Sequence, residues 1–191
     1  MPGSVATAPR EEPHPQTWIA VLGKRDVPTD GVEDYCTFLG RALGQRGVQL
    51  DLVRVDWFDR GWVPALWGLW RASRAWRGRW ILLQYTGLSW SRRGFPVGVV
   101  AALAILRRRG CRCTVVFHEF TRQSGTLRRI DRMRGRCQQW AIEKLYRGST
   151  KSIFTVPLET VGWLPPGDIK SRFVRIGGNM PERLNQRAGP G

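Results

Sequence analysis

Residues 111–120 read CRCTVVFHEF, and this stretch decides the fold class. Its middle residues, Thr114 to Phe117, are all β-branched or aromatic, which is typical of a strand buried on both faces of a parallel sheet. The run ends at His118 and Glu119. Ligands of open α/β sheets bind just beyond the carboxyl ends of the strands, so this polar pair marks a candidate site. The alternative is that His118 is an ordinary hydrogen-bonded loop histidine.

Other apolar runs along the chain have the length of strands, and helical patterns separate them. The expected strands span residues 18–22, 48–55, 81–85, 152–156 and 173–176. The expected helices run from Gly31, capped by Asp30, to about Gly47, and over residues 62–76, 97–106 and 124–147, with a short turn near 158–163. This alternation predicts an α/β fold, doubly wound, with a mostly parallel sheet of about six strands and helices on both faces.

The long helix over residues 124–147 needs a buried stripe to pack on the sheet. Residues at helical spacing predict which side chains form it. The expected stripe contains Leu127, Ile130, Met133 or Arg134, Cys137, Trp140, Ala141 and Leu145.

A length of 191 residues suits one folded domain. Residues 1–16 carry several prolines and no apolar signal region, so we expect a disordered lead-in there. The Gly-, Pro- and Arg-containing end, 182–191, is expected to be a disordered tail. Residues 17–181 are therefore the expected domain.

The charge of the chain is strongly positive, with 31 Lys and Arg against 15 Asp and Glu, a net +16. Such a field favours anionic partners: phosphates, nucleic acid or an acidic membrane surface. The 4 cysteines have no paired C-x-x-C spacing, which indicates neither a zinc site nor a disulfide framework and favours reduced thiols in the cytoplasm. No run of about 18 uncharged apolar residues is present, so no transmembrane helix is expected.

Tryptophan and arginine alternate in the segment between Trp57 and Trp80. In the helix expected over residues 62–76, Arg71, Arg74 and, just beyond it, Arg77 lie away from the apolar face. Two interpretations stay open: a helix that lies on anionic lipid headgroups, and a helix that only covers the sheet with its arginines in water.

Residues 30–47 read DGVEDYCTFLGRALGQRG, and residues 84–119 end in His118 and Glu119. Together with two later segments, they resemble, in order, the amino-terminal, acceptor-side domain of GT-B glycosyltransferases of the family 4 type. Residues 30–47 are similar to that family's Gly-Gly-x-Glu loop and following helix. Residues 84–119 resemble its third strand, a helix and a fourth strand ending in His-Glu, and residues 156–166 and 173–181 resemble the stretch that closes the domain. The chain departs from the pattern at Asp30, which stands where the family has its first loop glycine, and at Gly178, which replaces the usual serine.

This resemblance implies an enzyme that moves a sugar from a nucleotide-sugar to a lipid-linked or polysaccharide acceptor, with retention of configuration and with neither a metal nor a cofactor. The second, donor-binding domain of such enzymes carries two glutamates separated by seven residues. That spacing is missing here, so the family's donor-binding domain is expected in cis or in trans, outside these 191 residues. An acceptor attached to lipid would place the chain in the cytoplasm, peripheral to the inner membrane leaflet.

The resemblance also implies roles for single residues. His118 would contact the transferred sugar, and Gly31 would lie against the donor phosphate or the acceptor. Gln84, Tyr85, Glu119 and Arg122 are the other expected substrate contacts. Cations following strand ends are candidate phosphate contacts, although each alone is more often a solvated surface charge: Lys24, Arg25, Arg92 and Arg93.

The alternative function is a non-catalytic basic α/β module that binds nucleic acid or an anionic membrane. Nucleic acid is disfavoured because the arginines are dispersed over several expected helices.

Other enzyme classes fit the sequence poorly. The chain has no G-x-G-x-x-G for a dinucleotide, no G-x-S-x-G for a serine hydrolase, no Asp-x-Asp metal motif and no second strand-end carboxylate for a glycosidase.

Overall fold

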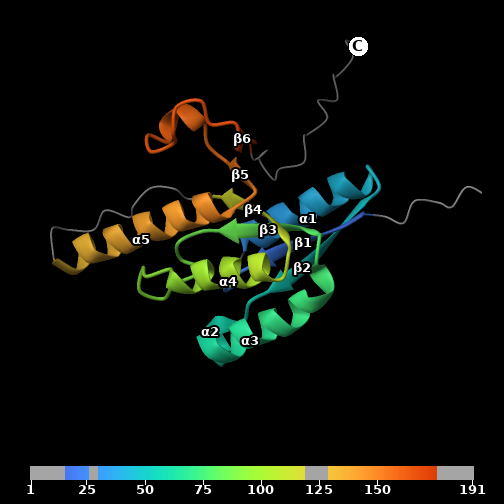
Figure 1. Ribbon diagram of the computed structural model, residues 1–191, viewed down its shortest axis with the longest axis horizontal. Coiled ribbons are helices and arrows are strands. Elements are labelled where there is room, and N and C mark those ends of the chain that lie inside the picture. Colours follow the sequence, from blue (N-terminus) through green and yellow to red (C-terminus); the bar gives the residue numbers. More distant parts are fainter. Residues whose placement is uncertain (1–15, 26–29, 119–128, 176–191) are drawn as a thin grey trace, which may run out of the picture.

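The computed structural model describes residues 16–25, 30–118 and 129–175. It contains one sheet in which every neighbouring pair of strands is parallel, in the order β2-β1-β3-β4-β5-β6 (Figure 1). The strands are β1 Gln16–Leu22, β2 Val48–Arg54, β3 Trp80–Tyr85, β4 Arg112–Phe117, β5 Lys151–Phe154 and β6 Ser171–Phe173. The predicted doubly wound α/β class, a Rossmann-like arrangement, is confirmed.

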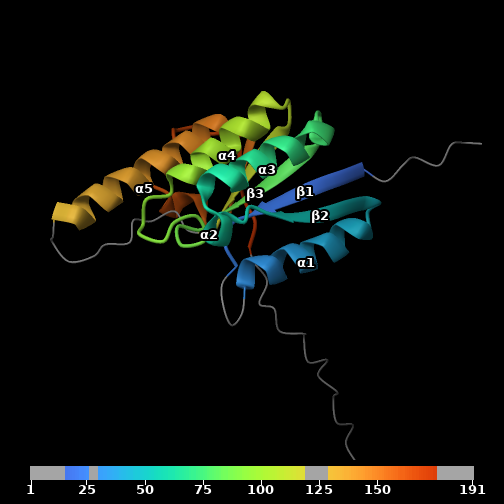
Figure 2. The same cartoon turned by 90° about the horizontal axis from the view of Figure 1, so that it is seen from below.

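The helices lie on both sides of this sheet. They are α1 Gly31–Gly44, α2 Trp57–Arg60, α3 Trp62–Ala72, α4 Val97–Arg108 and α5 Arg129–Gly148, with 3₁₀ turns at Ser73–Trp76 and Leu158–Thr160. Figure 2 shows α1 on one side of the strands and α3, α4 and α5 on the other. The reversal of winding direction between β1 and β3 produces this division, because right-handed crossovers that run in opposite directions place their helices on opposite faces.

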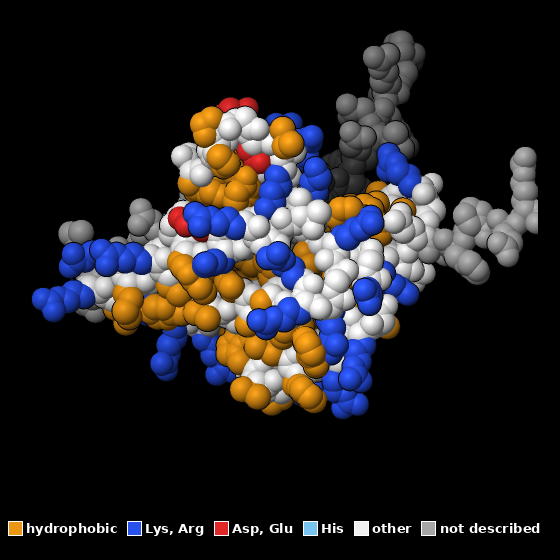
Figure 3. Space-filling view, viewed as in Figure 1, with side chains coloured by type: hydrophobic (Ala, Val, Ile, Leu, Met, Phe, Trp, Pro, Cys, Tyr) orange, Lys and Arg blue, Asp and Glu red, His pale blue; other side chains and the backbone are white. Residues whose placement is uncertain are grey.

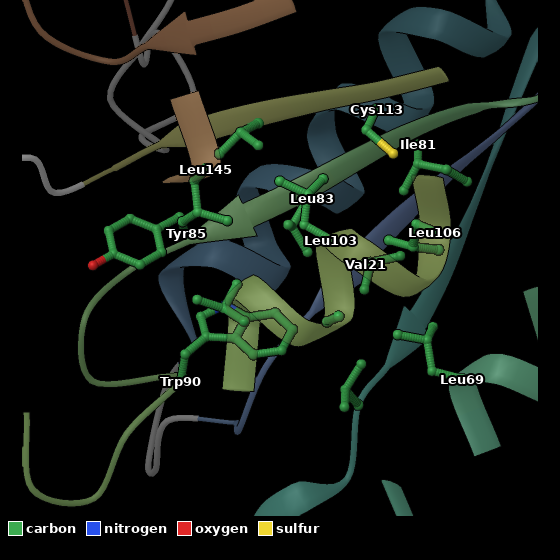
Figure 4. Close-up of a cluster of buried hydrophobic side chains, with 14 of the residues drawn as sticks. Val21, Leu69, Ile81, Leu83, Tyr85, Trp90, Leu103, Leu106, Cys113 and Leu145 are labelled. Atoms are coloured by element: carbon green, nitrogen blue, oxygen red, sulfur yellow. The ribbon is translucent and has the colours of Figure 1, made fainter. Parts of the chain in front are cut away.

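The larger part of the core lies between the sheet and α3, α4 and α5. Figure 4 shows side chains of β1, β3 and α4 meeting there, among them Val21, Leu83 and Leu106, each fully buried. A smaller cluster packs α1 on the other face, where Cys36 contacts Ala20 and Leu22 of β1. The central strands are therefore apolar on both faces, as the sequence of β4 predicts.

Several element boundaries differ from the prediction; the strand expected over residues 152–156, for example, is Lys151–Phe154. The last strand is Ser171–Phe173 rather than 173–176, because Ser171 pairs with Ser152 and Phe173 with Phe154. The helix expected over 62–76 ends at Ala72 and continues as a 3₁₀ turn. An additional short helix, α2, precedes it, and Gly61, with φ of +81°, separates the two helices.

The predicted buried stripe of α5 is wrong at several positions. Ala141 and Leu145 are buried as expected, but Ile130, Met133 and Trp140 are exposed. Gly135 and Gln138 are buried in their place. A different side of α5 is buried because the loop before α4 packs on it, with Gly94 close to the Arg134 and Gln138 side chains. Leu127 lies outside the described residues.

No helix in the described ranges combines the length and apolar character that a membrane crossing needs. Cys36, Cys111, Cys113 and Cys137 are free thiols, and the first three are buried.

Candidate functional site

His118 lies at the carboxyl edge of the sheet, immediately after β4, and is paired with a residue from the neighbouring strand. Its Nε2 nitrogen lies 2.8 Å from Oε1 of Gln84, near the end of β3. An amide oxygen only accepts hydrogen bonds, so Nε2 carries the hydrogen and Nδ1 is left as an acceptor. Tyr35 of α1 meets the imidazole edge-on, with ring centroids 5.2 Å apart.

The surroundings of His118 keep its imidazole neutral. Burial lowers the pKa of His118 to about 4, and the negative charge of Asp30 only partly opposes that shift. At neutral pH the side chain is therefore an uncharged hydrogen-bonding group of fixed tautomer. Such a group suits the orientation of a hydroxyl-rich ligand better than the binding of a phosphate.

Arg54, the last residue of β2, ties the end of β1 to the start of α1. Its guanidinium donates to the carbonyl of Gly23 at 3.0 Å, to Asp30 at 3.2 Å from both Nη atoms, and to Glu33 at 2.8 Å. Arg25 adds an ion pair to Glu33 at 3.1 Å. Arg54 is not among the residues predicted from the sequence, where its one local signal is a cation that ends an expected strand next to the candidate edge.

The amino terminus of α1 is occupied by the chain's own carboxylate. Oδ1 of Asp30 accepts hydrogen bonds from the backbone N–H groups of Val32 and Glu33, each at 3.1 Å. Asp30 is thus the N-cap that the sequence predicts. Because this carboxylate adds negative charge and uses two of the free N–H groups, it disfavours a phosphate at the same place. Gly31 begins the helix, and a Cβ atom there would meet nothing within 4 Å.

A second feature of the carboxyl edge is an open hollow of about 540 Å³ that follows β2 and β3. Aromatic side chains and two arginines surround it, namely Trp57, Phe58, Trp62, Phe95, Arg92 and Arg93, together with Gly61 and Ser91. The indoles of Trp57 and Trp62 are stacked, with centroids 4.7 Å apart and an interplanar angle of 4°. Apolar walls with a few cations suit a ligand that has both a ring or chain and an anionic group.

Two of the predicted phosphate contacts converge on one aromatic ring beside this hollow. The Nζ of Lys24 lies 4.3 Å, and the guanidinium of Arg92 3.8 Å, from the centroid of the Phe58 ring. Arg92 also donates to the Phe58 carbonyl. Arg93 lines this hollow and a neighbouring one that includes Asp131 and Arg134. The structure therefore groups Lys24, Arg92 and Arg93, whereas Arg25 is in the ion pair with Glu33.

The loop after β3 is held in place by backbone and side-chain hydrogen bonds. The indole N–H of Trp90, which is fully buried, donates to the Gln84 carbonyl at 2.7 Å. The Ser89 carbonyl accepts from the Trp57 indole at 2.9 Å and from the Lys24 backbone at 2.7 Å. A Cβ atom on Gly23 would lie 2.3 Å from that carbonyl oxygen, so only glycine permits this approach. These contacts connect the hollow to the Gln84–His118 pair.

Of the remaining predicted residues, only Tyr85 lies within the described ranges. Tyr85 is 2% exposed and packs against Phe117 in the core (Figure 4), so a role in substrate binding stays a prediction. Glu119 and Arg122 lie outside the described residues. Within the three described ranges, no group of three or more His, Cys, Asp or Glu side chains is arranged to hold a metal ion.

No known protein-family model matches this chain, and the comparison with curated proteins finds no match either. The similarity to family 4 glycosyltransferases consequently stays a resemblance of motifs, and the function has to be argued from the site itself.

Proposed function

We propose that this chain is the acceptor-side domain of a glycosyltransferase that moves a sugar from a nucleotide-sugar to a lipid-linked or polysaccharide acceptor. The observation that carries the proposal is the neutral His118, fixed by Gln84 at the carboxyl edge of a Rossmann-like sheet. A neutral imidazole that presents an acceptor nitrogen orients sugar hydroxyls without attracting the phosphate that departs with the nucleotide.

The hollow beside Phe58 supports the acceptor half of the proposal. Its aromatic walls suit an isoprenoid chain or a sugar ring, and Arg92 and Arg93 suit the phosphate that joins them. The nucleotide-sugar would be held by the donor-binding domain, in cis or in trans. Because Asp30 caps α1, we propose that Gly31 borders the acceptor rather than the donor phosphate.

Sugar incorporation in membranes tests this proposal. Membranes from cells that overproduce the chain are incubated with radiolabelled uridine- and guanosine-diphosphate sugars, so that the host can supply the partner domain. We expect wild-type chain to raise incorporation into lipid or polysaccharide at least about tenfold above His118→Ala, the range for loss of a positioned catalytic contact. The matched control, Arg46→Ala on an exposed turn, should behave like wild type.

Equal incorporation by His118→Ala, at matched amounts of folded protein, would remove His118 from the reaction. No incorporation above background by the wild type with any donor would instead favour a non-catalytic binding module.

We also propose a peripheral position on an anionic membrane leaflet, through the outer face of α3. Val63 and Trp67 of that helix are 81% and 61% exposed, and Arg71 follows them at the same helical spacing. An exposed apolar and aromatic pair next to a cation is typical of helices that lie on anionic headgroups. This observation favours the membrane over nucleic acid as the anionic partner.

A further inference from the structure

A third hollow, of about 400 Å³, lies at the opposite edge of the sheet from His118. Its lining residues come just before β3 and β4 in the chain, on the turn that follows α3 and on the end of α4. Its lining consists almost entirely of arginine: Arg74, Arg77, Arg107, Arg108 and Arg109, with Gly110. Figure 3 shows Lys and Arg side chains gathered over the end of α3 at the lower right.

The two segments that carry these arginines are bound firmly to each other. The N–H of Gly78 donates to the carbonyl of Gly110 at 2.9 Å, and the N–H of Arg112 donates to the carbonyl of Arg79 at 2.9 Å. Gly78 and Gly110 have φ values of +77° and +76°. A Cβ atom on Gly110 would also lie 3.2 Å from Cγ of Arg77. The arginines therefore lie on two segments in fixed positions, the turn after α3 and the end of α4, rather than on free loops.

One of the arginines has an evident structural role. The guanidinium of Arg109 stacks 3.4 Å from the Trp70 ring centroid and donates to the Trp70 carbonyl from Nε at 3.2 Å and Nη2 at 2.9 Å. The guanidinium groups of the other four form no ion pair with any carboxylate in the described ranges, and no Asp or Glu lines the hollow.

The helix dipole explains only part of the cluster. Cations in the last turn of α4 complement the negative end of its dipole, which accounts for Arg107 and Arg108. Arg74 and Arg77 belong to a different element, yet they line the same hollow. Like charges that line one hollow repel one another, and a bound anion would relieve this repulsion.

We propose that this hollow binds a ligand with at least two phosphate groups, a diphosphate or a polyphosphate. A phosphate monoester carries about −1.5 to −2 charges at pH 7, so one such group would neutralise at most about half of the charge of the four arginines other than Arg109. Guanidinium forks bind phosphate oxygens bidentately. The hollow lies at the sheet edge opposite His118, and it is a binding function that does not depend on glycosyl transfer.

Calorimetric titration with sodium tripolyphosphate, at constant ionic strength and without divalent cations, tests the proposal on the full chain. We expect binding by the wild type and at least about a tenfold loss in both Arg74→Gln/Arg77→Gln and Arg107→Gln/Arg108→Gln. The matched control is Arg132→Gln/Arg136→Gln, which removes the same charge from exposed positions of α5 and should change the affinity less than about threefold. Because the substituted arginines are exposed, all variants should fold, as circular dichroism will verify.

A second titration identifies the source of the phosphates. Phosphatidylcholine vesicles that contain a lipid diphosphate replace tripolyphosphate, and binding in either titration with the same pattern of variants supports the site. The proposal is overturned if the wild type binds in neither, or if the α5 control loses as much affinity as the two hollow variants, because net charge alone would then explain the binding.

Discussion

His118 differs from a surface histidine in the charge that it carries near neutral pH. Burial lowers its pKa from 6.5 to about 4, so in the window between these values the unfolded chain binds a proton that the folded chain does not. Stability must therefore fall as the pH falls through this window, and it is fully present above about pH 6.5.

The substitution His118→Gln removes this titration and keeps a side chain that can hydrogen-bond to Gln84. We expect wild type to lose about 1 to 2 kcal/mol more unfolding free energy than the variant between pH 7 and pH 5. Urea denaturation at both pH values measures the difference. If the unfolding free energies of the two proteins changed equally between the two pH values, His118 would titrate like an exposed histidine.

Arg54 is the second residue whose role depends on its partners. Replacement by Ala leaves Asp30, whose side chain is 6% exposed, and Glu33 without their shared cation. We expect a loss of about 2 kcal/mol in unfolding free energy, below the range for fully buried pairs because Arg54 is 28% exposed. Arg54→Lys should recover part of it, and Arg46→Ala should stay within about 0.5 kcal/mol of wild type.

At the scale of elements, the contact between α3 and α4 depends on one glycine. A Cβ atom on Gly98 of α4 would lie 2.1 Å from the ring of Trp62, the first residue of α3. Trp62 in turn stacks on Trp57 and lies 6.4 Å, centroid to centroid, from Trp90. The absence of a side chain at residue 98 thus positions a wall of the hollow near Phe58.

Substitution of Gly98 by Ala should reduce stability by about 1 to 3 kcal/mol, because overpacking outweighs the gain in helix propensity. The control is Gly68→Ala in α3, where a Cβ atom meets nothing within 4 Å, and which should raise stability by about 0.5 to 1 kcal/mol. Urea midpoints at constant m value distinguish the two results. A stabilised Gly98→Ala protein would show that Trp62 moves aside easily.

At the scale of the whole molecule, the net charge of +16 is spread over many elements, so that binding to an anionic surface needs a local anchor to be specific. The outer face of α3 is the proposed anchor. Arg71 does not line the arginine-rich hollow, which lets the membrane proposal be tested separately from the phosphate proposal.

The double variant Trp67→Ala/Arg71→Gln should bind phosphatidylglycerol vesicles at least about fivefold more weakly, since a cation near such a surface contributes about 1 kcal/mol. Trp140→Ala/Arg136→Gln is the matched control, because it removes an exposed Trp and an exposed Arg from α5. Cosedimentation measures both. Equal losses in the two variants would assign vesicle binding to charge and apolar content in general.

The sequence by itself determined the features that depend on neighbours along the chain. Apolar runs of strand length separated by helical patterns specified the parallel α/β fold, Asp30 specified the start of α1, and the end of β4 put His118 at the carboxyl edge. Features that depend on contacts between distant segments were decided only by the tertiary structure. These features are the neutral state of His118, the four hydrogen bonds of Arg54, the buried stripe of α5 and the hollow lined by arginines of two segments. The physical reason is that periodicity is local, whereas charge state and burial depend on distances between residues that the fold alone brings together.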